Sequence, residues 1–189
     1  MGGVIDMKCP ICKNVCLKKT NLMNDLFAFA CDTCGGNWMR YEDYWKWYCN
    51  NTEIKVDWNN IKKHLAVSDS SKAKICPDCG RILIKYKVDN RLDFYLDQCG
   101  CCNGIWFDKN EWDNLKLNNI HNRIHHFFTK PWQKKLREEA ARDKFEDKYI
   151  KKFGRWDYER LKEMREWIYN SSTKSEMLSF LIDEDPYKL

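Results

Sequence analysis

Apolar and polar residues alternate over four short stretches of the chain, and these stretches come in two pairs. The alternation predicts two β-hairpins, with strands Leu17–Leu22 and Leu26–Ala30 in the first and Ile82–Val88 and Leu92–Asp97 in the second. The short segments between the strands, 23–25 and 89–91, are rich in the Asn and Asp residues of tight turns. A hairpin of this size is marginally stable by itself in water, so each should need further support.

Each hairpin is followed by a stretch with helical periodicity. The first predicted helix lies around Tyr41–Cys49. The second begins near Asp108, which with Glu111 three positions later forms the Asp variant of a capping box. We therefore expect Asp108 to be the N-cap of the second helix.

The segment between the two units gives three weaker predictions. Residues 53–58 alternate as a strand would, and residues 59–65 are typical of a short helix. Residues 66–74 are rich in Ser, Ala and Lys and are expected to be a flexible linker. Such a linker would let the two hairpin units move independently, unless aromatic residues hold them together.

The last third of the chain is helical and strongly charged in its pattern. Apolar residues keep helical spacing through Phe128, and a second stripe runs from Trp132 to Phe153. Gly154 is expected to end that helix, and Asp157 is expected to cap the next one. A final helix should begin with the capping box Thr173–Glu176.

The region 129–189 is balanced in charge, with 15 basic and 13 acidic residues. It allows two interpretations: a helical hairpin packed on the rest of the chain, or a docking arm for a larger partner. Three of its aromatic residues, Trp132, Trp156 and Trp167, are of the type that anchors protein interfaces.

Eleven cysteines among 189 residues change this picture. No secretory signal, myristoylation pattern or stretch of roughly 18 apolar residues is present, so we expect an intracellular protein, cytoplasmic or alternatively nuclear, without a membrane partner. In a reducing compartment, metal binding explains the cysteines better than disulfides do. Eight of them form two sets of paired Cys-x2-Cys motifs, separated by 18 and 19 residues: Cys9, Cys12, Cys31 and Cys34, and then Cys76, Cys79, Cys99 and Cys102. This spacing predicts two closed, structural four-cysteine Zn²⁺ sites.

The two cysteine sets belong to an internal repeat. Both copies begin Cys-Pro-x-Cys, and in both the last cysteine is followed at a fixed distance by a tryptophan, Trp38 or Trp106. An acidic residue comes five positions after each tryptophan, at Asp43 and Glu111. The agreement indicates a duplicated unit of about 40 residues.

The repeated pattern resembles the transcription factor IIB-type zinc-ribbon family. The resemblance covers residues 7–49 and 74–117, and the second copy is the closer match because Arg40 replaces the Asp that the family favours in the first. It implies a zinc-ribbon fold with four cysteine ligands per copy and no transferable catalytic activity. The expected fold is therefore a small, zinc-stabilised α+β protein of two tandem zinc ribbons followed by a helical C-terminal region. The expected domains are 1–65, a linker 66–74, 75–128 with an extended helix, and a charged amphipathic arm 129–189.

The remaining cysteines and histidines leave several readings open. Cys101 is an alternative to Cys102 as the partner of Cys99, although the repeat favours Cys102. Cys16 and Cys49 are expected to be small apolar residues in or near a core. His121 and His125 are four residues apart, which would suit either a metal or a solvated helix face near a polar partner, the more frequent case.

Charge and motifs separate the candidate functions. Eight thiolates and two Zn²⁺ ions together carry −4, which lowers the formal charge from +5 to +1 and weakens the case for phosphate binding. No metalloprotease, deaminase, nucleophile-elbow or phosphate-loop motif is present, so no catalytic residues and no enzyme activity are expected. The first hypothesis is a non-catalytic zinc-binding adaptor that docks onto a protein partner through the C-terminal helices.

Two other classes remain as alternatives. In a nucleic-acid-binding or transcription-associated protein, the aromatic residues of the second hairpin would stack on bases and its cations would meet phosphates. The residues concerned are Tyr86, Phe94 and Tyr95, with Lys85, Lys87 and Arg91. A redox or metal-handling protein would require labile zinc and reactive thiolates.

Overall fold

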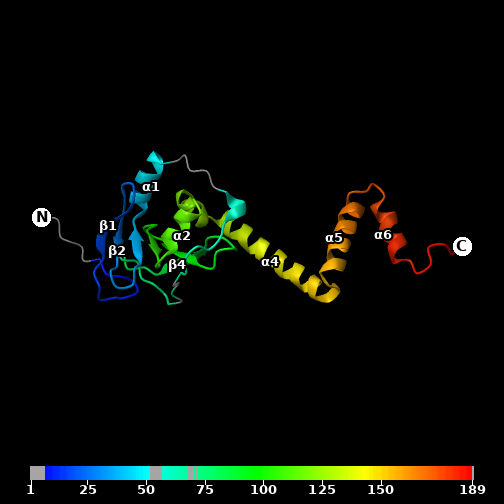
Figure 1. Ribbon diagram of the computed structural model, residues 1–189, viewed down its shortest axis with the longest axis horizontal. Coiled ribbons are helices and arrows are strands. Elements are labelled where there is room, and N and C mark those ends of the chain that lie inside the picture. Colours follow the sequence, from blue (N-terminus) through cyan, green and yellow to red (C-terminus); the bar gives the residue numbers. More distant parts are fainter. Residues whose placement is uncertain (1–6, 52–56, 68–69, 71, 189) are drawn as a thin grey trace. The chain divides into compact units, whose positions relative to one another are not determined.

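The computed structural model describes residues 7–51, 57–67, 70 and 72–188. Its strands are β1 (Lys18–Met23), β2 (Leu26–Ala30), β3 (Asn37–Met39), β4 (Leu83–Lys87), β5 (Tyr95–Cys99) and β6 (Ile105–Phe107). They form one antiparallel six-stranded sheet in the order β1-β2-β3-β6-β5-β4. Figure 1 labels β1, β2 and β4 among them. The predicted fold class, α+β with two zinc-ribbon units and a helical C-terminal region, is confirmed.

Both predicted hairpins are present. β1 pairs with β2 and β4 pairs with β5, each close to the ranges that the alternation indicates. In the first hairpin, Asn24 and Asp25 turn the chain with φ values of 33° and 65°. Asn and Asp tolerate positive φ better than most residues do, so the turn forms where those two residues occur.

The two units are joined through their third strands, β3 and β6. Each of these strands comes directly after the second cysteine pair of its unit, and the two run antiparallel. Their three opposed pairs are Asn37–Phe107, Trp38–Trp106 and Met39–Ile105. Because Trp38 and Trp106 are equivalent residues of the repeat, this register places a local two-fold axis at the tryptophan pair.

A helix follows each third strand, and both helices contribute to one core. The first, α1 (Tyr41–Asn50), agrees with its prediction; the second is α2 (Glu111–Leu117). Their buried aromatic residues pack with alternate residues of the strands, among them Leu26, Ala28, Met39, Tyr44, Trp47, Phe94, Leu96, Phe107 and Trp112. The two ribbons therefore share a hydrophobic core as well as a sheet.

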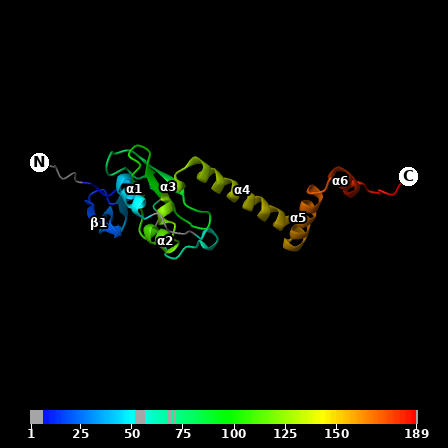
Figure 2. The same ribbon diagram turned by 90° about the horizontal axis from the view of Figure 1, so that it is seen from above.

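The chain leaves α2 through a short irregular segment and not as one extended helix. Asn119 has a φ of 55°, which ends the regular helix. A 3₁₀ turn, η2 (His121–Arg123), and the short helix α3 (Ile124–Phe127) follow. Helix α3 lies beside α1 (Figure 2), and Ile124 and Phe127 are buried in the common core.

The helix predicted over 59–65 is wrong, and α2 gives the physical reason. Only the 3₁₀ turn η1 (Trp58–Asn60) forms there. The backbone that follows is irregular, because the side-chain amide of Asn114 accepts from the N–H of Leu65 (3.0 Å) and donates to the Leu65 carbonyl (3.0 Å). Asn118 makes the same pair of bonds with Lys62 (3.0 and 2.9 Å). The strand predicted over 53–58 falls mostly outside the described residues.

The chain divides into two compact units, residues 1–137 and 138–189. Helix α4 (Lys130–Phe153) begins in the first unit, where Trp132 Nε1 donates to the Val88 carbonyl (3.0 Å) and Gln133 Nε2 donates to the Lys87 carbonyl (2.8 Å). The domain boundaries expected from the sequence stay predictions.

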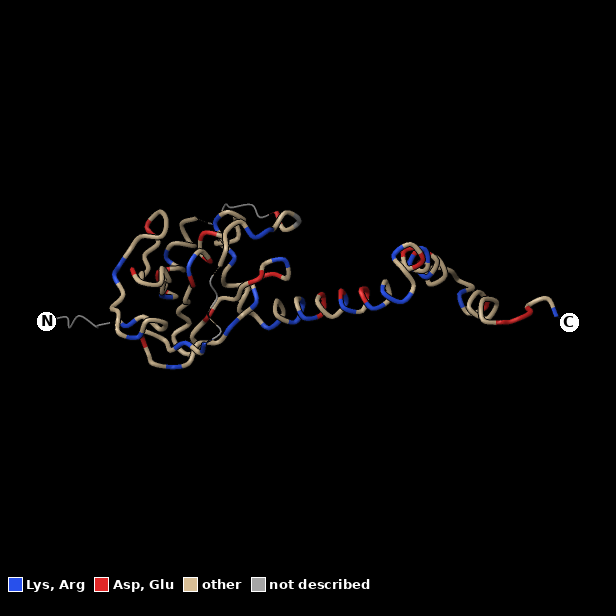
Figure 3. Tube along the Cα trace, turned by 60° about the horizontal axis from the view of Figure 1, so that its bottom comes forward, with Lys and Arg blue, Asp and Glu red and all other residues tan. Residues whose placement is uncertain are grey.

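The second unit consists of the rest of α4 with α5 (Arg155–Tyr169) and α6 (Lys174–Ile182). Basic and acidic residues alternate along α4 (Figure 3). Gly154, with a φ of 79°, ends α4 as predicted and is itself the N-cap of α5, so the expectation for Asp157 is wrong. Thr173 occupies the predicted N-cap position of α6, although its side chain makes no capping hydrogen bond. Within the described residues, no helix is long and apolar enough to span a bilayer.

Candidate metal centres

The eight paired cysteines gather into two groups of four. Within each group the Sγ atoms all lie within 4.8 Å of one another. In the first group Cys9–Cys34 and Cys12–Cys31 are separated by 3.6 and 3.8 Å, and in the second Cys76–Cys102 and Cys79–Cys99 are separated by 3.5 and 3.4 Å.

These distances fit a tetrahedral metal site. Four sulfurs bound to Zn²⁺ at about 2.3 Å are about 3.8 Å apart along the edges of the tetrahedron. A disulfide would instead bring two sulfurs to about 2.05 Å. Cysteine sulfurs fill all four positions of each tetrahedron, as in a structural site.

Each Cys-x2-Cys pair is a tight turn that ends in a residue with positive φ. These residues are Lys13 (59°), Gly35 (72°), Gly80 (72°) and Asn103 (58°). In each turn the backbone N–H of that residue donates to the carbonyl of the first cysteine of the pair, over 2.9–3.0 Å. Two of the four residues are glycines, and Lys13 and Asn103 adopt the same positive φ in the other two turns.

Backbone N–H groups also stabilise the thiolate form in each centre. The Cys12 N–H lies 3.3 Å from Cys9 Sγ, and the Cys101 N–H lies 3.4 Å from Cys99 Sγ. Burial raises the pKa of Cys31 and of Cys99, but backbone hydrogen bonds outweigh it and lower each pKa to about 7. Burial raises the pKa of Cys9 to about 11, so the positive charge of a bound Zn²⁺ is what would keep that thiol deprotonated.

The two centres share a second apolar cluster. Trp38 and Trp106 lie fully buried in it beside Cys9, Cys31, Cys76 and Cys99. Each indole covers the glycine before the other copy's third strand, because a Cβ built on Gly36 would overlap the Trp106 ring and one built on Gly104 would overlap the Trp38 ring. The two tryptophans thus pack across the contact between the ribbons.

Different partners bind the two indole N–H groups. Trp38 Nε1 donates to Oδ2 of Asp78 in the other copy (2.9 Å), and Arg40 forms an ion pair with the same carboxylate (2.9 Å). In the second copy, Trp106 Nε1 donates to Oδ1 of its own Asp108 (2.6 Å). Arg40, which replaces the acidic residue of the family pattern, therefore connects the first ribbon to the second.

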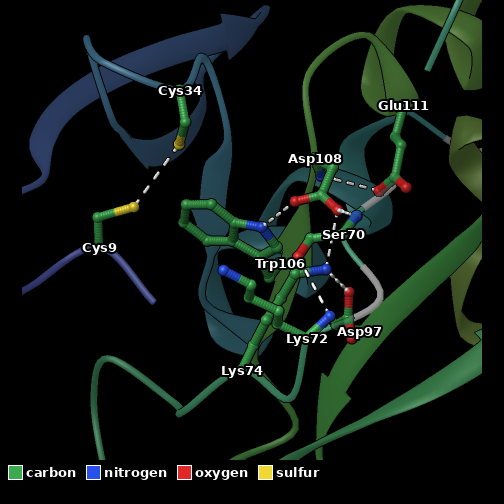
Figure 4. Close-up of polar contacts among 9 residues, drawn as sticks. All are labelled: Cys9, Cys34, Ser70, Lys72, Lys74, Asp97, Trp106, Asp108 and Glu111. Atoms are coloured by element: carbon green, nitrogen blue, oxygen red, sulfur yellow. Dashed lines mark hydrogen bonds and ion pairs between the residues drawn. The ribbon is translucent and has the colours of Figure 1, made fainter. Parts of the chain in front are cut away.

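A buried charged network lies within the second ribbon, and Figure 4 shows it together with Cys9 and Cys34 of the first centre. Lys74 Nζ contacts Asp97 Oδ2 (2.5 Å) and Asp108 Oδ2 (2.8 Å), and all three side chains are about 1% exposed. Asp108 Oδ2 also accepts the backbone N–H of Ser70 (3.0 Å), which ties the segment before the ribbon to its third strand. Burial raises the pKa of Asp97, so Lys74 provides the compensating charge.

This network corrects the predicted helix cap. Asp108 turns its side chain to Lys74 and Trp106, and Asn110, with a φ of 69°, is the N-cap of α2. One of the two hydrogen bonds of a capping box is present, because Glu111 Oε2 accepts the Asp108 backbone N–H (2.8 Å).

The three cysteines outside the two groups of four do not behave as core residues. Cys16, Cys49 and Cys101 are all exposed, so the prediction that Cys16 and Cys49 lie in or near a core is wrong. Cys102, and not Cys101, stands in the second group of four.

The histidines pack against aromatic rings and do not form a shared face. His121 is buried between Trp47 and Trp112, with ring centroids 5.6 and 5.8 Å away. His125 Nδ1 lies 2.8 Å from the Tyr44 hydroxyl, and burial lowers the pKa of His125 to about 4. Burial raises the pKa of Tyr44, so the phenol keeps its proton beside a neutral His125. The solvated helix face expected for this pair is wrong.

The residues considered for nucleic-acid contacts are dispersed. Phe94 is fully buried, Tyr86 packs edge-on against Phe128, and Arg91 binds Asp89. Tyr95 alone among the aromatic candidates is exposed, with Lys87 Nζ 4.7 Å and Lys85 Nζ 6.0 Å from its ring centroid.

The fold and the two four-cysteine groups define a tandem zinc-ribbon protein with two structural Zn²⁺ sites. Residues 75–117 match the family model described as the transcription factor zinc-finger, and this second copy is a transcription factor IIB-type zinc ribbon. The first copy lies outside that match. It repeats the strands, the Cys-x2-Cys turns and the helix of the second copy in the same order. No curated protein and no solved structure matches the chain. Zinc ribbons of this family are generally non-catalytic.

Proposed function

We propose that this protein is a non-catalytic adaptor, in which two structural zinc ribbons form one rigid module and the C-terminal helices dock onto a larger protein assembly. The observation that carries the proposal is the apolar surface of unit 138–189. Ile168 is the single buried side chain among its described residues, whereas Trp156 and Trp167 are 68% and 66% exposed. A monomeric protein rarely leaves so much aromatic surface in water unless that surface binds a partner.

The ribbon module supports the non-catalytic part of the proposal. A catalytic zinc keeps an open coordination position for water or substrate, and four cysteines per site leave none. Exposed thiols such as Cys16 and Cys49 would be oxidised outside a reducing compartment, which favours the cytoplasm, or alternatively the nucleus.

Quantitative cross-linking of the full chain in cells tests the docking surface. We expect Trp167→Glu, on the exposed helical surface, to remove the cross-links to the partner. The matched control is Tyr95→Glu, an exposed aromatic residue on the ribbon module, which should keep them. If both variants keep the same cross-linked partners, the helices are not the docking surface.

A second candidate function, nucleic-acid binding, is favoured by one specific observation. Lys19 lies 4.3 Å from the Phe27 ring centroid in the first hairpin, and Lys87 lies 4.7 Å from the Tyr95 ring in the second. Phe27 and Tyr95 are equivalent positions of the repeat, four residues before the third cysteine, and both are exposed. An exposed ring beside a cation can stack on a base while the cation meets a phosphate.

Binding of labelled single-stranded DNA, duplex DNA and RNA across a salt series tests this alternative. Sub-micromolar binding that weakens steeply with salt, and weakens at least tenfold in Tyr95→Ala, would establish it. Absence of binding at low salt would remove it and leave the protein adaptor.

A further inference from the structure

A groove runs between helices α4 and α5 of the C-terminal unit. Its volume is about 630 Å³, and aromatic and aliphatic side chains form its floor, among them Phe145, Tyr149 and Leu161. Phe145 is 59% exposed and Tyr149 44% exposed, so no other segment of the described chain covers this floor. The groove has the shape and the chemistry of a site for an amphipathic helix.

Helix α6 of the same unit is the counterpart of such a groove. It has the most apolar sequence of the three helices, Met177-Leu178-Ser179-Phe180-Leu181-Ile182. Its residues Met177, Phe180 and Leu181 line a pocket together with residues of α5. Even so, Phe180, Leu181 and Ile182 are 52%, 54% and 81% exposed. The unit therefore carries both an empty apolar groove and an uncovered apolar helix.

The charges around the two features have opposite sign. The groove is bordered by three cations and two anions, which are Arg142, Lys162, Arg165, Glu146 and Glu166. Residues 174–185, which contain α6, carry one cation and four anions, namely Lys174, Glu176, Asp183, Glu184 and Asp185. A helix with the chemistry of α6 would thus meet a net positive border.

We propose that the protein forms a homodimer in which α6 of each copy lies in the α4–α5 groove of the other. The exchange is reciprocal, so two identical contacts form around one two-fold axis and the assembly closes at two copies. This inference rests on the proposed function, because it names a second copy of the chain as the occupant of the docking helices. Both the groove and the helix would lose their exposed apolar surface in the dimer.

The full-length, zinc-loaded chain is the material for the test, and its mass in solution is the readout. Sedimentation velocity over a series of micromolar concentrations should give about twice the 22.8 kDa mass of one chain. Two variants each remove one side of the contact: Phe145→Glu in the groove and Ile182→Glu on α6. Each should weaken dimerisation at least tenfold, and far-UV circular dichroism and a content of two zinc ions per chain should show that both remain folded.

Mixing the two variants tests the reciprocal geometry. In a mixed dimer, the intact α6 of Phe145→Glu can enter the intact groove of Ile182→Glu, so one complete contact returns and a dimer should form. The matched control is Trp156→Glu, which changes an exposed aromatic residue of α5 outside the groove and should leave the dimer intact. If the dimer instead formed by α6 packing on α6, or by groove packing on groove, mixing the two variants would not restore dimer formation.

The outcomes separate this inference from the proposed function. A chain that is monomeric throughout, variants that still form dimers, or a mixture that remains monomeric would each overturn the dimer. If the chain is monomeric while Trp167→Glu abolishes cross-links to another protein, the adaptor function stands without the dimer. If the dimer forms as described and no variant changes any cross-link to another protein, the dimer stands and the adaptor function fails.

Discussion

Trp38 and Trp106 face each other across the centre of the six-stranded sheet, and each indole lies on the glycine that precedes the other's strand. The pair is fully buried in the cluster that contains cysteines of both metal centres. The same two rings therefore fill the contact between the ribbons and pack beside the cysteines of both zinc sites.

Gly104→Ala is expected to destabilise this contact. The new Cβ would overlap the Trp38 ring, and overpacking of a dense core typically costs about 1–3 kcal/mol. Chemical denaturation should show this loss in the free energy of unfolding. Gly100→Ala is the matched control, because the nearest atom to its Cβ, Ile84 Cδ1, is 3.6 Å away. Equal stabilities of the two variants would argue against the tryptophan contact.

Replacing a cysteine of either group should release one metal ion. Cys31→Ser or Cys76→Ser should reduce the zinc content from two ions per chain to one and unfold its ribbon, since a structural zinc contributes its binding free energy to folding. Metal analysis by mass spectrometry measures the content. Cys101→Ser, at an exposed cysteine outside the groups, should keep both ions. Unchanged zinc in the first two variants would contradict the assignment of the ligands.

Lys74→Met should be among the most destabilising single changes in the second ribbon. It leaves Asp97 and Asp108 buried without their cation, and breaking a buried ion pair in this way costs about 3–5 kcal/mol. Met7 and Phe29 occupy the equivalent positions of the first ribbon, so the double variant Lys74→Met with Asp97→Phe should recover part of the loss. Thermal unfolding compares the two, and a double variant no more stable than the single one would contradict this account.

Acid should weaken the fold in part through His125. Its pKa is about 4 in the folded chain, where burial lowers it, against 6.5 ordinarily. Between these values the unfolded chain binds a proton that the folded chain does not, so stability falls as the pH drops from 6.5 towards 4. His125→Asn keeps an acceptor for the Tyr44 hydroxyl but does not titrate, which makes it the control. The stability of the unaltered chain relative to this variant should therefore decrease over that range, and a constant difference would exclude the effect.

The sequence predicts those parts of the fold that local pattern determines. Alternation locates both hairpins, helical periodicity locates α1, and cysteine spacing groups the sulfurs as the structure does. The pairing of β3 with β6 could not be foreseen, because each strand has three residues and its partner lies almost 70 positions away. The repeat itself was the available signal, since two equivalent strands can pair about a two-fold axis.

Two of the errors share one cause, which is that distant polar residues bind groups that the local pattern assigns to a helix. Asp108 has the sequence signature of a helix cap, but Lys74 and Trp106 bind its carboxylate. Residues 59–65 have a helical pattern, but Asn114 and Asn118 bind their backbone groups in an irregular conformation. Lys74 would be placed on the surface by any local rule, because its burial depends on two carboxylates more than 20 residues away.

The junction of β3 and β6 also protects one sheet edge of each ribbon from pairing with a strand of another molecule. A fragment that carried one ribbon would end its sheet in an open edge strand, with a bare indole beside it. Open edges of that kind recruit strands from other molecules, and many β proteins guard them with charges, prolines or bulges. Here duplication closes one edge of each copy, because β3 pairs with the equivalent strand β6, and this leaves β1 and β4 at the edges of the sheet. The two halves are therefore joined by backbone pairing that does not involve their metal ligands.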